Sequence, residues 1–371
     1  MASHGYLADA ELLALSHQVA ASRDRLHTLD FFKRRRPASP PDELEVLRRW
    51  NSHTPMLYTE LGGGFFLRWR GRGIVIDPGC TFIDIFRRDH PTVGLGAHCM
   101  DDIDLIIVSH DHVDHSGDLS SLLTLLRAFN RWREEEAARL RTAFQPRKVD
   151  LVLSLGVYYK CQTLLEHPDY RSLLRTCKVL PPRHISDAVD RINLEADYGF
   201  KLECLKTRHR EIMGESTGFG IKLTLKNGWD SFVLCDSGDT AYEEEVAGQF
   251  EASDLLILHV GTLEKLPDQS AGRGEHLCFG GVVKTLRQLK RPPKLVMLSE
   301  WGQEFCYPGL RKRFTELIRR YAPGSTVVLP SDLGMRVSIP NCHIRCTGGA
   351  YAPAGQVQVR DNGTWLSYLN S

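Results

Sequence analysis

The sequence lacks both a long apolar run and a net charge of either sign. No stretch approaches the ~18 to 20 apolar residues that span a bilayer, so we expect no membrane partner. The 47 Lys and Arg residues balance 46 Asp and Glu residues to a net charge of +1. The chain therefore has no overall field that would draw it to nucleic acid or to an acidic membrane. The first residues also lack a basic start followed by an apolar stretch, so we expect no secretion signal.

Cysteine occurs ten times, but its positions do not form a pattern of pairs. The residues are scattered from Cys80 to Cys346, and without an export signal this favours reduced thiols and a cytoplasmic location. The segment Cys342-His343-x-x-Cys346 lacks the second ligand pair of a zinc finger, so we interpret it as part of a strand. With 42% hydrophobic and 25% charged residues, the composition is that of a globular protein and excludes disorder as the main architecture.

Two regions can be distinguished along the 371 residues. Residues 1–50 are predicted to form an N-terminal helical extension, with helices over Ala8–Phe32 and Pro41–Trp50 and a basic, proline-containing linker between them. Residues 51–371 are predicted to form one main domain with a helical insert at about residues 127–200.

Within the main domain, strands dominate the first half and helix–strand units the second half. Glycine-rich turns and short apolar runs predict the early strands, and an amphipathic helix over Leu119–Phe129 continues as a charged helix over Arg131–Arg141. After Asp236, three helices alternate with three strands. Two sheets flanked by helices, an α/β fold, is the packing that this order favours. Further strands are predicted at 65–69, 74–76, 104–108, 149–155, 201–205, 220–225 and 231–234, and a helix at 158–167.

The most informative segment is Ser109-His110-Asp111-His112-Val113-Asp114-His115, which follows a buried strand and precedes a helix. Residues two apart at the end of a strand project to the same side, so His110 and His112 can reach one ion. The chain then turns, and Asp114 and His115 point toward a neighbouring position. These two half-sites of imidazole and carboxylate suit two divalent metal ions, with Zn²⁺ favoured and Mn²⁺ or Fe as alternatives.

This H-x-H-x-D-H segment resembles the signature of the metallo-β-lactamase superfamily, and the chain from about Gly62 to Arg336 can be aligned with that fold. The resemblance implies an αββα four-layer sandwich with the metal centre at one edge of the two sheets. It assigns Asp77 the role of orienting a ligand histidine. It also assigns His209 as the third histidine of the first metal site and Asp236 as the carboxylate that bridges the two metals.

The last ligand departs from the family pattern. A histidine is expected after the strand Leu295–Ser299, and this chain has Glu300 there. His259 and His276 are alternatives for that position. We expect Glu300 to complete the second site together with Asp114 and His115, with His276 as the proton donor to the leaving group.

The predicted chemistry is hydrolysis by a hydroxide held between two metal ions, and Asp114 is expected to be essential for it. The order of elements resembles the ribonuclease Z and phosphodiesterase branch, so we expect a nucleotide or RNA-type phosphodiester substrate. The interval from His209 to Asp236 is only 27 positions, which leaves little room for a tRNA-binding arm. Tyr158 and Tyr159 are candidates for the wall of the site.

Two other interpretations stay open at this point. The same fold can hydrolyse lactones, thioesters or amides, and it can also act as a non-catalytic metal-binding scaffold. The sequence does not decide between a monomer and a homo-oligomer.

Overall fold

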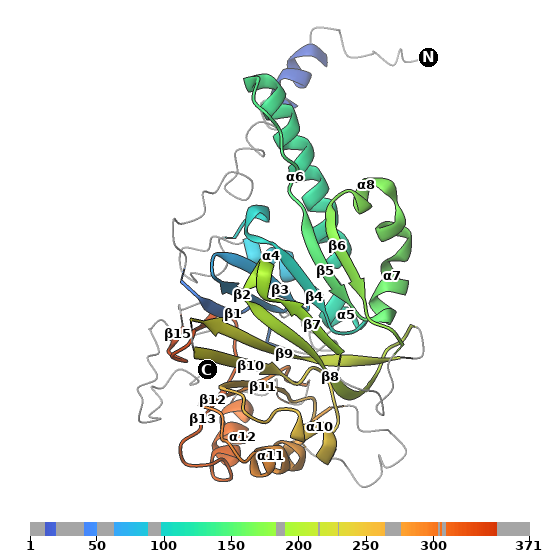
Figure 1. The fold of residues 1–371 in the computed structure, drawn as a ribbon. Coiled ribbons are helices and arrows are strands. Elements are labelled where there is room, and N and C mark those ends of the chain that lie inside the picture. Colours follow the sequence, from blue (N-terminus) through green and yellow to red (C-terminus); the bar gives the residue numbers. More distant parts are fainter. Residues whose placement is uncertain are drawn as a thin grey trace, which may run out of the picture.

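Two β-sheets packed face to face form the centre of the molecule, and helices cover both outer faces (Figure 1). The computed structural model describes residues 12–19, 41–49, 63–87, 98–182, 190–213, 216–228, 230–263, 276–302, 305 and 309–346. This four-layer arrangement confirms the α/β sandwich predicted from the order of the elements.

The first sheet has eight strands in the order β15-β14-β1-β2-β3-β4-β5-β6. Strands β3 to β6 are parallel, and the remaining neighbours pair antiparallel. Because the parallel strands end at the same edge, the loops that follow them lie together. The strands are β1 (Glu43–Val46), β2 (Phe65–Trp69), β3 (Arg72–Ile76), β4 (Leu105–Val108), β5 (Val149–Leu153), β6 (Leu174–Val179), β14 (Met335–Ser338) and β15 (Ile344–Cys346).

The second sheet has seven strands in the order β13-β12-β11-β10-β9-β8-β7. Strands β10 to β13 are parallel, whereas β7 to β10 form an antiparallel meander. The strands are β7 (Asp190–Leu194), β8 (Phe200–Arg210), β9 (Thr217–Asn227), β10 (Asp230–Asp236), β11 (Leu255–His259), β12 (Leu295–Ser299) and β13 (Val327–Pro330).

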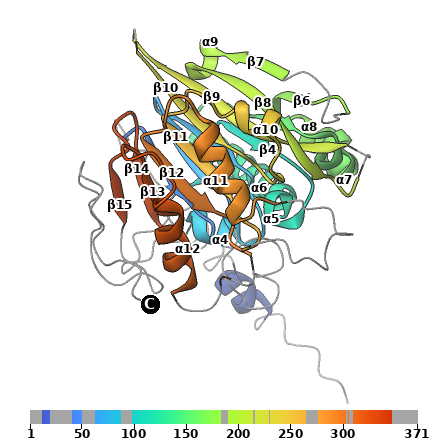
Figure 2. The same cartoon turned by 90° about the horizontal axis from the view of Figure 1, so that it is seen from below.

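The helices fall into two sets, one on each sheet (Figure 2). The first sheet is covered by α4 (Phe82–Arg87), α5 (Val113–Ser116), α6 (Leu119–Leu140), α7 (Leu155–Glu166), α8 (Pro168–Arg171) and the short η1 (Met100–Asp102). The second is covered by α10 (Glu244–Gly248), α11 (Phe279–Gln288) and α12 (Leu310–Arg319), while α9 (Glu195–Tyr198) joins β7 to β8. Among the described helices, none combines the length and the apolarity needed to cross a membrane.

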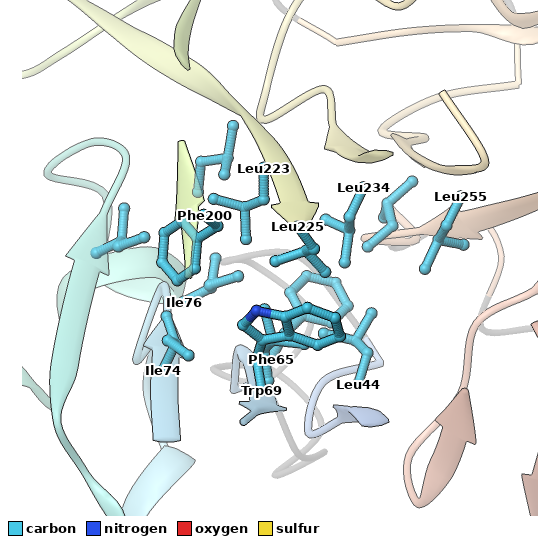
Figure 3. Packing of buried hydrophobic residues seen from close by; sticks show 14 of the residues in the cluster. Leu44, Phe65, Trp69, Ile74, Ile76, Phe200, Leu223, Leu225, Leu234 and Leu255 are labelled. Atoms are coloured by element: carbon cyan, nitrogen blue, oxygen red, sulfur yellow. The ribbon is translucent and has the colours of Figure 1, made fainter. Parts of the chain in front are cut away.

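The core between the sheets is built from the alternate residues of each strand. In β8, Phe200 and Leu202 are fully buried while Lys201 between them is exposed, as period-two alternation requires. Figure 3 shows Phe200 and Leu223 of the second sheet facing Ile74 and Ile76 of the first. This apolar layer holds the two sheets at a fixed spacing, and so it sets the position of the loops at their edge.

The predicted helix over Pro41–Trp50 is wrong, because this segment contains strand β1 between β2 and β14. Leu44 and Val46 point into the core, and Glu43 and Glu45 occupy the other face. Glu45 is buried there with His98, whose Nε2 lies 2.8 Å from its carboxylate, and with Arg336. Acidic residues concealed the strand alternation, since only the tertiary fold supplies the groups that balance their charge.

The other helices predicted for the N-terminal region and for the insert agree with the structure only in part. Residues 12–19 are helical, and the basic linker at residues 33–40 lies outside the described residues. Helix α6 is continuous, as predicted, and its far half extends beyond the sandwich (Figure 1). Residues 127–200 are only partly helical, since they also contribute β5 and β6 to the first sheet and β7 to the second.

The burial of Phe200 gives a direct test of the inter-sheet core. Phe200→Ala leaves a cavity between the sheets and is expected to lower the free energy of unfolding by about 3 to 5 kcal/mol. Lys201→Ala is the matched control, because this neighbour is exposed, and it should change the same quantity by less than about 0.5 kcal/mol. Urea denaturation of the two variants measures both values, and equal effects would contradict the inward orientation of Phe200.

Candidate metal centre

The candidate site residues lie where strands of both sheets end at one edge of the sandwich. His110 and His112 follow β4, and Asp114 and His115 belong to the short helix α5. From the second sheet, His209 lies near the end of β8, and His259 is the last residue of β11. Glu300 follows β12 directly. Segments almost 200 residues apart are therefore brought to one place by strand ends.

A first group of side chains consists of His110, His112, His209 and Asp239, whose ligand atoms lie within 4.8 Å of one another. Nδ1 of His112 is 3.0 Å from Nε2 of His209, and Asp239 Oδ2 is 3.7 Å from Nε2 of His110 and of His209. Burial lowers the pKa of His110 well below its ordinary value and lowers that of His209 to about 4. These imidazoles are neutral near pH 7, the form that binds a metal ion.

A second group consists of His115, Asp239, His259 and Glu300, again with ligand atoms within 4.8 Å. Glu300 Oε1 lies 2.8 Å from His115 Nε2, and its Oε2 lies 2.7 Å from His259 Nδ1. Asp239 Oδ1 lies 2.9 Å from the same His259 nitrogen. Asp239 thus belongs to both groups, with one oxygen toward His259 and the other toward the first group.

Several of these buried polar atoms make no hydrogen bond within the described part of the chain. They are His110 Nε2, His115 Nε2, Asp114 Oδ1 and both carboxylate oxygens of Glu300. The contact between His115 and Glu300 is as short as a hydrogen bond without having its geometry. Lone pairs that converge in this way leave an uncompensated polar centre, which a divalent cation fits. Imidazole and carboxylate donors suit Zn²⁺ or Mn²⁺.

The structure does not place Asp236 in either group, and the position between the groups predicted for it is taken by Asp239. Asp236 ends β10, accepts a hydrogen bond from Gly238 N and lies 2.9 Å from His259 Nε2, on the far side of that ring. Gly238 has a positive φ of 56°, which turns the chain so that Asp239 enters the site. The sequence analysis missed Asp239, and the acid that follows Gly238 in Asp236-Ser237-Gly238-Asp239 is the signal that could have found it.

The structure brings the three candidates for the last ligand close together. Glu300 and His259 both join the second group, and the sequence presented them only as alternatives. His276 lies at the edge, with Nδ1 3.5 Å from Asp239 Oδ2 and its ring 5.0 Å from that of His209. Its side chain is 25% exposed, whereas His110, His209 and Asp239 are buried. His276 therefore faces both the metal groups and solvent.

Asp114 lies beside the second group without being one of its four members. Its Oδ2 is 3.6 Å from His115 Nε2, and burial raises the pKa of this carboxyl to about 6. The backbone holds it in place, because a Cβ on Gly79 would lie only 1.7 Å from Asp114 O. Only glycine at position 79 therefore allows this approach.

Two carboxylates orient the histidines of the second group from behind. Asp77 lies 2.8 Å from Nδ1 of His115 and accepts hydrogen bonds from Ser109 N and Oγ, which are the contacts that its expected role would need. Asp236 lies as close to His259 Nε2, at 2.9 Å, although this contact does not have hydrogen-bond geometry. A carboxylate on one ring nitrogen turns the other nitrogen toward the metal position.

A further set of contacts ties the loops that carry His112 and His209 to helix α7. Asp111 accepts hydrogen bonds from Ile212 N at 2.9 Å and Met213 N at 2.7 Å, which joins the loop after β4 to the loop after β8. Lys160 of α7 donates to Asp111 O and Ser116 Oγ. Glu211 accepts hydrogen bonds from Ser154 Oγ and Gly156 N at the start of α7. These bonds fix the relative position of His112 and His209.

The two tyrosines proposed for the wall of the site differ in their surroundings. The Tyr158 hydroxyl donates to Glu166 at the C-terminal end of α7, whereas the metal loops contact the N-terminal end. Tyr159 is exposed. The place of Tyr158 and of Tyr159 in the wall of the site stays a prediction.

Arg48 was not found from the sequence. This arginine, just after β1, is fully buried, and its Nη1 lies 2.6 Å from Glu300 Oε1.

The buried Glu211 predicts a pH dependence of stability. Desolvation raises the pKa of this carboxyl from 4.5 to about 7, so the native state favours its protonated form. Its stabilising contribution is complete below pH 4.5 and is lost as the pH rises through 7. Relative to Glu211→Gln, the metal-free wild type should lose on the order of 2 kcal/mol of unfolding free energy between pH 4.5 and 8. Urea denaturation measures this, and a difference independent of pH would contradict it.

Comparison with known proteins gives the family. The model of the β-lactamase superfamily domain matches residues 72–299, more than half of the chain. No curated protein sequence matches the chain. Among solved structures, the metallo-β-lactamase fold protein YhfI from Bacillus subtilis is similar, with 13% identity over 80% of this chain and 99% of that one and a TM-score of 0.56.

Two further structures share the fold at comparable similarity. The short form of human tRNase Z has 14% identity over 80% of this chain and 99% of that one, with a TM-score of 0.53. Yeast PDE1 has 12% identity over 81% of this chain and 100% of that one, with a TM-score of 0.50. The matched residues include β4, the histidine-rich loop, Asp239 and His259. The chain belongs to the metallo-β-lactamase superfamily.

Proposed function

We propose that this protein is a metal-dependent hydrolase that cleaves phosphodiester bonds in a nucleotide or RNA-type substrate. The observation that carries the proposal is the pair of buried histidine–carboxylate groups that share Asp239. A solvated histidine cluster would not leave buried nitrogen and oxygen atoms without hydrogen-bond partners, as the described residues of this site do.

The residues of the site divide the work of hydrolysis between them. Two divalent ions, when bound, would supply a hydroxide near neutral pH and polarise a phosphoryl oxygen. His110, His112 and His209 would hold one ion, and His115, His259 and Glu300 the other, with Asp239 between them and Asp114 beside the second. Asp77 and Asp236 would keep the rings of His115 and His259 in their orientation toward the second ion.

His276 is suited to deliver a proton to the leaving group. It contacts Asp239 on one side and solvent on the other, so a substrate entering from solvent would meet its ring. An imidazole can hold and release a proton near neutral pH, which the departing alkoxide of a phosphodiester requires. Its partial exposure distinguishes it from the buried histidines of both groups.

The comparisons support the scaffold on which the proposed chemistry rests, and the substrate is our proposal. The similar structures include the human tRNase Z, yeast PDE1 and a diphosphatase of the PhnP family, each named for a nucleic-acid or phosphorus-ester activity. Their identities of 12 to 14% share the scaffold without transferring a substrate.

One observation favours a lactone or thioester hydrolase as the second candidate. Three exposed apolar side chains lie next to His112 and His209 in the chain: Val113 at the start of α5, and Ile212 and Met213 after β8. An acyl chain would bury this apolar surface, whereas a nucleotide phosphate would not. The two candidates therefore differ in the substrate they would turn over.

A matched pair of carboxamide variants tests the proposed function. Asp239→Asn removes the carboxylate shared by both groups and should lower kcat/KM by at least about 1,000-fold. Asp236→Asn, three residues away, only loosens the orientation of His259 and should lower it by about 10- to 100-fold. The measurement uses bis(p-nitrophenyl) phosphate and a medium-chain lactone, each with Mn²⁺ or Zn²⁺.

The outcomes of this assay separate the candidates. Turnover of the lactone alone would replace the proposed function by the second candidate. No turnover of either substrate by a metal-loaded wild type would favour the non-catalytic scaffold. Equal effects of the two variants would contradict the shared position of Asp239.

The role of His276 predicts a dependence on the leaving group. His276→Ala should lower kcat by about 100- to 10,000-fold for a phosphodiester with an alkoxide leaving group, which must be protonated. It should change kcat little for p-nitrophenolate, which leaves without a proton. Metal content, measured by elemental analysis, should match the wild type. A similar loss on both substrates would show that His276 does not act as the proton donor.

A further inference from the structure

The charge of the chain is unevenly distributed along the sequence. Residues 279–321 contain ten Lys and Arg residues but only three Asp and Glu residues, whereas the rest of the chain contains 37 and 43. This segment includes α11, β12 and α12 of the second sheet and its helical layer. The net charge of +1 therefore conceals one strongly basic part, and a local excess of this kind is typical of a surface that binds a polyanion.

Helices α11 and α12 lie side by side on the outer face of the second sheet (Figure 2). Val282 and Leu286 of α11 are buried against the sheet, as are Phe314 and Ile318 of α12. The opposite sides of the two helices therefore point to solvent. There they carry four exposed cationic side chains, which we call the basic face: Lys284, Arg287, Arg313 and Arg320.

The charges of the basic face are not neutralised within the described part of the chain. None of its four cations is ion-paired with a described residue, whereas two neighbours are, since Arg291 pairs with Asp254 and Arg311 with Asp332. Helix α11 carries no acidic residue, and Glu316 is the one acidic residue of α12. An anionic partner would therefore find a charge excess to neutralise on this face.

Aromatic rings hold two of these cations in place. The guanidinium carbon of Arg287 lies 5.1 Å from the centre of the Tyr321 ring, and Lys284 Nζ lies 5.3 Å from that of Tyr242. The apolar side chains beside them protrude little, since Leu317 is only 40% exposed and Arg287 covers the Tyr321 ring. Because insertion into a lipid surface needs protruding apolar groups, the face favours a phosphate backbone as its partner.

The basic face begins next to the second metal-binding group. Trp301 directly follows Glu300, and its ring lies 5.7 Å from the ring of Phe314, the neighbour of Arg313 in α12. Arg320 follows the last residue of the same helix, about 10 Å farther along its axis at 1.5 Å per residue. A strand bound along this face would therefore have one end close to Glu300.

We propose that the basic face binds the phosphate backbone of a single-stranded RNA and directs it to the metal centre. The proposal rests on the proposed function, because this RNA is the substrate of the same site. Most of the side chains in the two metal-binding groups are buried, so a single strand, which can bend, reaches them more readily than a rigid duplex. Lysine and arginine contacts to phosphate are independent of sequence and weaken with salt.

Binding of RNA without metal ions tests the proposal. A fluorescein-labelled oligouridylate of about 12 nucleotides is titrated in EDTA, and anisotropy is followed between about 50 and about 200 mM KCl. The triple variant Arg287→Gln/Arg313→Gln/Arg320→Gln should bind at least about 10-fold more weakly at the lower salt concentration. The slope of log K against log[KCl] should become shallower by about 2, because each phosphate contact to a single strand contributes about 0.7.

A second triple variant removes the same charge elsewhere. Arg131→Gln/Arg139→Gln/Arg191→Gln changes three exposed arginines of α6 and β7, each of which is ion-paired with a glutamate. It should weaken RNA binding by less than about threefold, since salt screens charges that do not contact the RNA. Circular dichroism and urea denaturation verify that both triple variants are folded.

Each outcome decides the proposal. Equal weakening by the two triple variants would attribute binding to net charge and overturn it. Wild type that binds vesicles containing phosphatidylserine but no RNA would also overturn it, in favour of a lipid surface. Turnover of bis(p-nitrophenyl) phosphate by the metal-loaded wild type, with no RNA binding, would overturn this proposal alone. RNA binding by a wild type that turns over no phosphodiester would contradict the proposed function, and with it the delivery of RNA to the metal centre.

Discussion

The shared carboxylate of Asp239 is the interaction on which the rest of the site depends. One oxygen lies 2.9 Å from His259, and the other lies 3.5 to 3.7 Å from His110, His115, His209 and His276. These histidines come from both sheets and from the loop before α11. In the first group, Asp239 is the one carboxylate beside three imidazoles, so it supplies the only negative charge among those four residues.

Two features of the fold place the histidines around Asp239: the strand ends at one edge of the sandwich, and the carboxylates that contact the histidines or their loops from outside the two groups. Parallel strands in both sheets end at the same edge, and the apolar core between them keeps the edge rigid. Asp77 and Asp236 hold the rear nitrogens of His115 and His259, and Asp111 joins the loops of His112 and His209. Carboxylates thus serve two purposes here, as candidate ligands and as groups that hold the ligands.

Strand β1 and the residues just after it link the first sheet to the candidate metal centre. Leu44 and Val46 complete the core between the sheets, and Glu43 and Glu45 are buried on the other face of the first sheet. Arg48, just after the strand, contacts Glu300. The segment 43–48 therefore both belongs to the first sheet and contacts a member of the second group. β1 also pairs with β14, so segments almost 300 residues apart in the chain lie side by side in the first sheet.

The sequence by itself determined the family, the two-sheet fold and the histidine-rich loop, because these depend on local alternation and on a motif within six residues. It also led to His209, Asp77 and Glu300, each of which ends or follows a recognisable strand. The sequence pointed to Asp236 for the shared position. Only the tertiary structure places Asp239 there, since the left-handed turn at Gly238 sets which carboxylate enters the site. It alone showed that Arg48 and His259 both contact Glu300, because these contacts depend on how strands far apart in the chain meet at one edge.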